Sequence, residues 1–165
     1  KCFGVFKNVA LELMSKIVLV TGGFDPIHSG HIEYFKSAKK LGDKLIVGVN
    51  SDEWLTRKKG HPFMPWTERA NIVYHLQMVD DVIVFDDADG SACGAIAVIK
   101  ERYRNESVIF ANGGDRTKTN IPEIDRYGDD SMVEFAFGVG GEDKMNSSSW
   151  ILNDFYTKKT KLITK

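Results

Sequence analysis

Hydrophobic residues gather in five short runs along the chain, and polar segments separate these runs. The runs lie at residues 17–20, 45–49, 82–85, 108–111 and 133–137. Most of them are apolar at every position, which is typical of parallel strands that are buried on both faces. The pattern therefore predicts five strands of one sheet.

Apolar residues between the first four runs recur at helical spacing. In the first such segment they stand three residues apart, at Ile32, Phe35, Ala38 and Leu41. Gly42 follows as a residue that can turn left-handed past a helix end. Thr67 suits the cap of a second helix, and residues 92–103 and 149–158 predict two more. Because strands alternate with helices, we expect right-handed crossovers and an α/β fold: a Rossmann-like, open, mainly parallel five-stranded sheet with helices on both faces.

Two segments do not follow this alternation and predict long loops. Residues 51–66 include three consecutive cations at positions 57–59, and residues 112–130 begin with an asparagine and two glycines. Both segments come directly after a predicted strand. Long loops in a compact domain are more often functional than idle, and open parallel sheets bind ligands outside the carboxyl ends of their strands. A binding site is therefore predicted at that edge of the sheet.

Composition limits the kinds of ligand. The chain has 165 residues, which suits one compact domain, and its 22 basic and 23 acidic side chains give a formal charge of −1. A broad positive field for non-specific nucleic-acid binding or for a polybasic membrane anchor is absent from such a chain. No apolar run approaches the ~18 residues of a membrane span. We therefore expect no nucleic-acid and no membrane partner, and a local site for any anionic ligand.

The cysteines and the first residues bear on the compartment and on the domain limits. Cys2 and Cys93 are too few for a disulfide framework and lack the CxxC spacing of zinc or redox sites. This favours a reducing, cytoplasmic environment. Met14 stands just before the first predicted strand, so we expect residues 1–13 to be an N-terminal extension, either upstream sequence or non-native, and residues 14–165 to form a single domain.

The most informative stretch joins the first predicted strand to the first predicted helix and reads TGGFDPIHSGH over residues 21–31. Its glycines let backbone N–H groups approach a ligand, and the N-terminus of the following helix favours phosphate. His28 and His31 are three residues apart, so both rings can lie on one side of a helical turn. Gly30 places no bulk between them and a ligand. Two imidazole donors above a helix N-terminus suit a triphosphate whose charge shifts during a reaction.

Three other kinds of site fit this stretch less well. A zinc site needs a third ligand at suitable spacing, and the sequence offers none, so we expect no metal-ligating residues. The stretch contains neither the GxGxxG dinucleotide fingerprint nor the GxxxxGK[ST] phosphate loop. A hydride-transfer enzyme and a phosphate-loop ATPase therefore lose their main support.

Residues 24–31, FDPIHSGH, resemble the HxGH signature of the nucleotidyltransferases. Residues 38–52, AKKLGDKLIVGVNSD, are similar to cytidylyltransferases that act on glycerol phosphate, and more similar still to those that act on sugar phosphates such as heptose. The likeness extends over about residues 16–155 and is weakest in the last quarter. It continues through Glu68-Arg69, residues 79–82 and Gly113-Gly114-Asp115.

The resemblance implies a reaction. The phosphate of a small phosphorylated polyol or sugar would attack the α-phosphorus of CTP, with release of pyrophosphate and with Mg²⁺ as the metal. Two alternatives stay open. The order GGFDPIH is also similar to adenylyltransferases that use ATP with nicotinamide or nicotinate mononucleotide or with phosphopantetheine, and a nucleotide-binding module without catalysis is the third hypothesis. Several relatives form homodimers, so a homodimer is a further expectation.

The resemblance also implies roles for single residues. The catalytic residues would be His28, His31 and Lys58, with Lys58 preferred to its neighbour. Contacts to the nucleotide are expected from Thr21, Gly22, Gly23, Phe24, Asp25, Gly30, Gly113, Lys144, Ser147, Ser148 and Ser149. Contacts to the second substrate are expected from Lys59, Arg69, Gly114, Asp115 and Arg116.

The stretch KMNSSS at residues 144–149 departs from the family pattern. It falls where cytidylyltransferases have a GxSTT-like helix start, and three hydroxyls at a helix N-terminus can bind phosphate oxygens together. The arginine that many relatives have before this motif is absent, and Met145 replaces the expected glycine. These departures favour the non-catalytic hypothesis, whereas the two histidines argue against it.

Overall fold

Five strands form one sheet in the order β3-β2-β1-β4-β5, and all four neighbouring pairs are parallel. The computed structural model describes residues 14–114, 116, 117, 119, 121–141 and 147–163. The strands are β1 (Lys16–Gly22), β2 (Lys44–Val49), β3 (Asp81–Ile83), β4 (Ser107–Ala111) and β5 (Val133–Ala136). The predicted open α/β sheet is confirmed, and it is parallel throughout.

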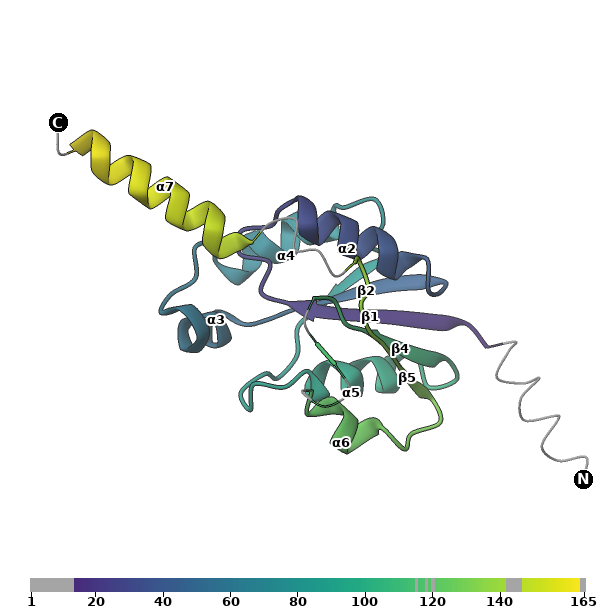
Figure 1. Cartoon of the computed structure of the whole chain (residues 1–165). Helices are drawn as coiled ribbons and strands as arrows, with labels where there is room; N and C mark the ends of the chain where they lie inside the picture. The colour runs from purple at the N-terminus through teal and green to yellow at the C-terminus, as the bar shows by residue number, and fades with distance from the viewer. Residues whose placement is uncertain (1–13, 115, 118, 120, 142–146, 164–165) are drawn as a thin grey trace, which may run out of the picture.

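The helices lie on both faces of this sheet (Figure 1). They are α2 (Ser29–Lys39), α3 (Asp52–Lys59), α4 (Trp66–Tyr74), α5 (Cys93–Arg102), α6 (Glu123–Tyr127) and α7 (Ser148–Ile163). Helices α2 and α4 pack on one face, and α5 and α6 pack on the other. Helix α7 projects away from the sheet beyond its first turns (Figure 1).

Strand β1 shows why the apolar runs form a buried sheet. Ile17 and Leu19 belong to the core on the α5 side, whereas Val18 and Val20 belong to the core on the α2 side. All four side chains are fully buried. Because successive side chains of a strand point to opposite faces, an uninterrupted apolar run is what a strand needs when helices cover both sides.

Both predicted long loops contain a helix. Residues 51–66 include α3, whose first turn is capped by the Ser51 side chain, which accepts a hydrogen bond from the Trp54 backbone N–H at 3.0 Å. Residues 112–130 include the short α6. These helices were not predicted because both segments are mostly polar, and few apolar residues in them mark a buried face.

Two predicted helix signals have other roles. Helix α4 is preceded by Pro65, and Thr67 lies inside its first turn, so Thr67 is not the cap. Gly42 is not among the residues with left-handed backbone within the described chain. A Cβ at Gly42 would lie 2.7 Å from the Lys16 carbonyl oxygen, so close packing against β1 explains this glycine.

Within the described residues, no helix combines the length and the apolar character needed to cross a membrane.

Candidate active site

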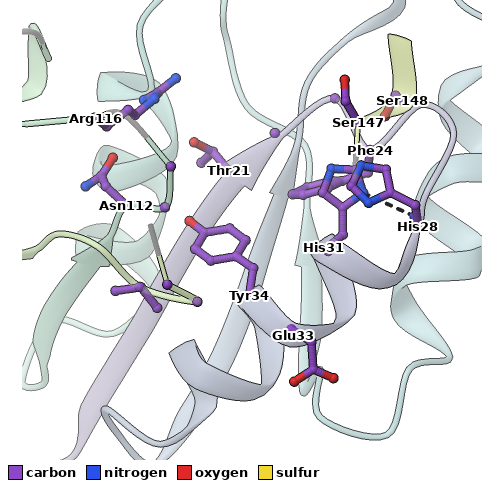
Figure 2. A pocket seen from close by; sticks show the side chains of 18 of the residues that line it. Thr21, Phe24, His28, His31, Glu33, Tyr34, Asn112, Arg116, Ser147 and Ser148 are labelled. Carbon is purple, nitrogen blue, oxygen red and sulfur yellow. Dashed lines mark hydrogen bonds between the residues drawn. The ribbon is translucent and has the colours of Figure 1, made fainter. Parts of the chain in front are cut away.

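A cavity of about 580 Å³ lies at the carboxyl ends of β1 and β4. Strand β1 is paired with β2 on one side and with β4 on the other. The chain therefore reverses its direction of winding at β1, and such a switch point is where open α/β sheets bind ligands. The loop before α2, the loops after β4 and β5, and the start of α7 all line this cavity (Figure 2).

Most of the predicted site residues come together here. The structure places the following predicted residues in the cavity wall: Thr21, Gly22, Gly23, Phe24, His28, Gly30, His31, Lys59, Gly113, Gly114, Arg116, Ser147, Ser148 and Ser149. Asp115 and Lys144 lie outside the described residues. Asp25, Lys58 and Arg69 are described but do not line the cavity.

The two histidines form one unit in the cavity wall. Their rings are stacked, with centroids 3.7 Å apart and an angle of 24° between the planes. The His28 backbone N–H donates to Nδ1 of His31 at 3.3 Å, the contact drawn as a dashed line in Figure 2. The spacing of three residues at the start of α2 thus brings both imidazoles to the same ligand space.

The environment of His31 keeps its ring neutral. Burial lowers the pKa of His31 to about 3, and the charges of nearby His28 and Lys59 act in the same direction. Because Nδ1 accepts a backbone hydrogen bond, the single proton of the neutral ring resides on Nε2. His31 is therefore a fixed hydrogen-bond donor through Nε2 at neutral pH.

The Phe24 ring packs against the imidazole of His31. Its ring meets His31 edge to face at 5.1 Å between centroids, and it meets Phe35 in the same way at 5.0 Å. Phe24 adopts a left-handed backbone, with φ of 49°, which is rare for a bulky residue. A Cβ at Gly22 would lie 2.8 Å from the Phe24 ring, so a glycine at this position leaves room for that ring.

The start of α7 meets the loop that carries the histidines. Ser148 Oγ donates to the Pro26 carbonyl oxygen at 2.9 Å, and Ser147 and Ser148 are both buried. In Figure 2 these two serines lie beside the histidine rings. The N-terminus of a 16-residue helix therefore points its backbone donors at the same space as the imidazoles.

Asp25 holds a loop and does not face the cavity. Its carboxylate accepts hydrogen bonds from the backbone N–H groups of Phe63 and Met64, at 2.6 and 2.8 Å. The side chain is 1% exposed. In this structure both carboxylate oxygens hold the segment after α3, and the contact of Asp25 with the nucleotide stays a prediction.

Of the two neighbouring lysines, the structure brings Lys59 to the cavity and not Lys58, which the sequence analysis preferred. Lys59 lines the cavity and its Nζ donates to the Asp25 carbonyl oxygen at 3.2 Å. Burial lowers the pKa of Lys59, while Asp25 opposes this shift and Arg69 adds to it. Lys58 instead lies over the Trp54 ring, 5.2 Å from its centroid. Successive residues of a helix point about 100° apart, so only one of the two can face the cavity.

Arg69 is buried and binds protein groups. Its guanidinium donates to the carbonyl oxygens of Gly23 at 2.7 Å, Asn50 at 2.9 Å and Met64 at 3.0 Å. It also pairs with the Asp52 carboxylate at 2.6 Å. The expected contact of Arg69 with a substrate phosphate is replaced by a role in joining β1, β2, α3 and α4 at the site.

Sequence reasoning missed six residues of the cavity wall, which are Glu33, Tyr34, Asn112, Val139, Gly140 and Gly141. Tyr34 follows His31 by three residues, so helical spacing alone could have placed it on the same face. Asn112 directly precedes the predicted glycine pair. Gly140 and Gly141 follow the last predicted strand. The glycine pair after β4 was predicted as part of the site from the same kind of position, so the same reasoning could have found these two. Glu33 is an exposed rim residue that pairs with Lys36 at 2.8 Å.

Comparisons with known proteins identify the family of this chain. The cytidylyltransferase-like family model matches residues 19–137. A bifunctional protein HldE from Actinobacillus succinogenes is 36% identical over 126 residues, covering 69% of this chain and 26% of that protein. A bifunctional protein HldE from Pelobacter propionicus is 32% identical over 145 residues, covering 85% of this chain and 28% of that protein. The chain thus spans about a quarter of the length of these curated relatives.

Solved structures share the fold. A lipopolysaccharide core biosynthesis protein from Thermoplasma volcanium aligns with a TM-score of 0.57 at 27% identity, over 78% of this chain and 99% of that one. A putative nicotinate-nucleotide adenylyltransferase from Vibrio parahaemolyticus aligns with a TM-score of 0.58 at 15% identity, over 85% and 86% of the two chains, which shows the fold alone. The matched residues include the second half of β1, all of α2 and the histidine pair. The chain belongs to the cytidylyltransferase-like family of nucleotidyltransferases.

Proposed function

We propose that this chain transfers a nucleotidyl group from a nucleoside triphosphate to the phosphate of a small phosphorylated sugar, with release of pyrophosphate. The observation that carries the proposal is the stacked histidine pair, which faces the same cavity as the N-terminus of α7. Two imidazoles and a helix N-terminus together form a site for a polyphosphate.

The residues in the cavity suit a direct displacement. An oxygen of the acceptor phosphate forms a bond to the α-phosphorus, and the bond from that phosphorus to the bridging oxygen breaks. The electron pair of the broken bond leaves with pyrophosphate. Donors that are already oriented stabilise this developing charge without reorganisation. His31 Nε2 is such a donor, and Lys59 and the first turn of α7 add positive potential at the same end of the cavity.

The described part of the cavity wall offers no protein cage for magnesium. Within the residues that the structure describes, no group of three His, Cys, Asp or Glu side chains is arranged to hold a metal ion. The carboxylate of Asp25 is used by two backbone N–H groups. Magnesium in the proposed reaction would be held by the phosphate oxygens and water.

The donor and acceptor follow from different observations. The family model favours CTP as the donor, and the GGFDPIH order keeps ATP as the second candidate. The Thermoplasma neighbour is a lipopolysaccharide core biosynthesis protein, and this supports a sugar phosphate as the acceptor. A cytoplasmic setting, where nucleoside triphosphates are available, belongs to the same proposal.

The proposal is tested by pyrophosphate release. The chain is incubated with Mg²⁺, with CTP or ATP, and with a panel of sugar phosphates, polyol phosphates, nicotinamide mononucleotide and phosphopantetheine. We expect release with one triphosphate and one sugar phosphate, and no release without the acceptor. Release only with ATP plus nicotinamide mononucleotide or phosphopantetheine would replace the sugar-phosphate proposal. Nucleotide binding without turnover in every mixture would point to the non-catalytic module.

A further inference from the structure

Tyr34 lies at the junction of the two ends of the cavity. It is on α2, one helical turn after His31, and its ring forms part of the cavity wall between the histidines and Asn112 (Figure 2). The end of the cavity opposite the histidines, here called the β4–β5 end, is lined by residues 112–114, Arg116 and residues 139–141. Tyr34 thus comes from the helix that carries the histidines and faces the loops of the other end.

A hydrogen bond ties Tyr34 to the β4–β5 end. The Tyr34 hydroxyl donates to the Ala111 carbonyl oxygen at 2.6 Å, at the last residue of β4. Burial raises the pKa of Tyr34 well above its ordinary value, and Arg116 and the Gly113 backbone amide oppose this shift only in part. The phenol therefore remains a hydrogen-bond donor throughout the working pH range.

The loops of the β4–β5 end also pack directly on Tyr34. A Cβ at Gly113 would lie 3.1 Å from the Tyr34 ring, and a Cβ at Gly140 would lie 3.0 Å from the Tyr34 Cα. The two loops are joined to each other, because the Val139 backbone N–H donates to the Asn112 carbonyl oxygen at 3.1 Å. A side chain at 113 or 140 would therefore require its neighbours, Tyr34 among them, to shift by a few tenths of an ångström.

Through these contacts Tyr34 connects the two ends of the cavity that the proposed reaction would use. If the histidines and α7 hold the phosphates, the β4–β5 end holds a part of the nucleotide beyond them. The two ends of the cavity must then be as far apart as the phosphates are from the rest of the nucleotide. Tyr34 makes both a polar and a packing contact across this distance, and both contacts involve main-chain atoms or glycines of the opposite loops.

We propose that Tyr34 is a positioning residue that sets the distance between the histidine pair and the β4–β5 end, and so determines the affinity for the non-phosphate part of the nucleotide. This inference rests on the proposed function. It predicts that loss of the hydroxyl affects binding of the whole nucleotide and spares binding of the phosphates alone.

The test compares Tyr34→Phe with the wild type in two titrations, one with inorganic tripolyphosphate and one with the nucleoside triphosphate that the wild type uses. We expect the dissociation constant of the nucleotide to rise about 3- to 10-fold, which is the range for one lost hydrogen bond. The dissociation constant of tripolyphosphate is expected to stay within about twofold of the wild type. In turnover assays, KM for the nucleotide should rise while kcat changes little.

Tyr74→Phe is the matched control, because Tyr74 is 53% exposed on α4 and does not line the cavity. It should behave as the wild type in both titrations. Gly113→Ala is the second variant, and it decides the matter if Tyr34→Phe does not fold. Its Cβ would lie 3.0 Å from the Val139 carbonyl oxygen and 3.1 Å from the Tyr34 ring, so it disturbs the packing of this loop on Tyr34 and should give the same selective loss of nucleotide affinity.

The outcomes separate the two proposals. Equal weakening of tripolyphosphate and nucleotide, or no change in either, would overturn the role of Tyr34 while the wild type still binds both ligands. A fall in kcat at unchanged KM would also overturn it. Failure of the wild type to bind tripolyphosphate at all would overturn the proposed function, and the role of Tyr34 with it.

Discussion

Replacement of His31 by alanine is expected to lower turnover by about 10²–10³-fold while the fold stays intact, as for the loss of one oriented donor to a transition state. His31 is prepared for this role before the nucleotide binds. Burial keeps its ring neutral, and the His28 backbone N–H fixes its tautomer. Solvent would have to replace the lost donor, and water does so poorly because it must reorganise as charge develops.

The measurement is the rate of pyrophosphate release at saturating substrates, with circular dichroism as the check on the fold. His75→Ala is the matched control, since His75 is exposed at the end of α4 and does not line the cavity. It should retain wild-type turnover. Unchanged turnover in a folded His31→Ala variant would remove this imidazole from the chemistry.

Replacement of Arg69 by leucine is expected to reduce the free energy of unfolding by about 3–5 kcal/mol, because its buried guanidinium serves three backbone carbonyl oxygens and each buried group left without a partner costs about 1–3 kcal/mol. The Arg69 side chain is fully buried, and its loss would leave the carbonyl oxygens of Gly23 and Asn50 without these donors. The Asp52 carboxylate would also lose its partner. Leucine fills part of the space but donates no hydrogen bond.

Urea unfolding measures this change directly. The matched control is Arg102→Leu, which removes an arginine from an exposed pair with Asp81. Exposed pairs contribute roughly 0–1 kcal/mol, so this variant should unfold close to the wild type. A loss below about 1 kcal/mol for Arg69→Leu would contradict the role of Arg69 as the group that joins four elements at the site.

The parts of the molecule that local pattern determines could be predicted. The buried strands follow from uninterrupted apolar runs, because both faces of this sheet are covered by helices. The histidine pair follows from a spacing of three residues at a helix start. Both predictions use only residues that are close together in the sequence, so they do not depend on which distant segments come into contact.

The choice between neighbouring or similar charged residues could not be made in this way. Lys58 and Lys59 have the same chemistry, and only the rotation of α3 decides that Lys59 faces the cavity. Asp25 and Arg69 have charges that suit a nucleotide site. Their partners are backbone groups brought close by folding, such as the Met64 N–H and the Gly23 carbonyl oxygen. Backbone groups are the same at every residue, so the sequence gives no sign of these contacts.

The most direct test of the central claim, that both imidazoles bind one polyphosphate, is ¹⁵N NMR of the histidine side chains during titration with tripolyphosphate at pH 7. Before addition, His31 should show a neutral ring with its proton on Nε2. We predict that the Nε2 signals of His28 and His31 then shift together, with one dissociation constant, while those of His61 and His75 stay in place. A shift of only one of the two cavity histidines, or of neither, would contradict the account.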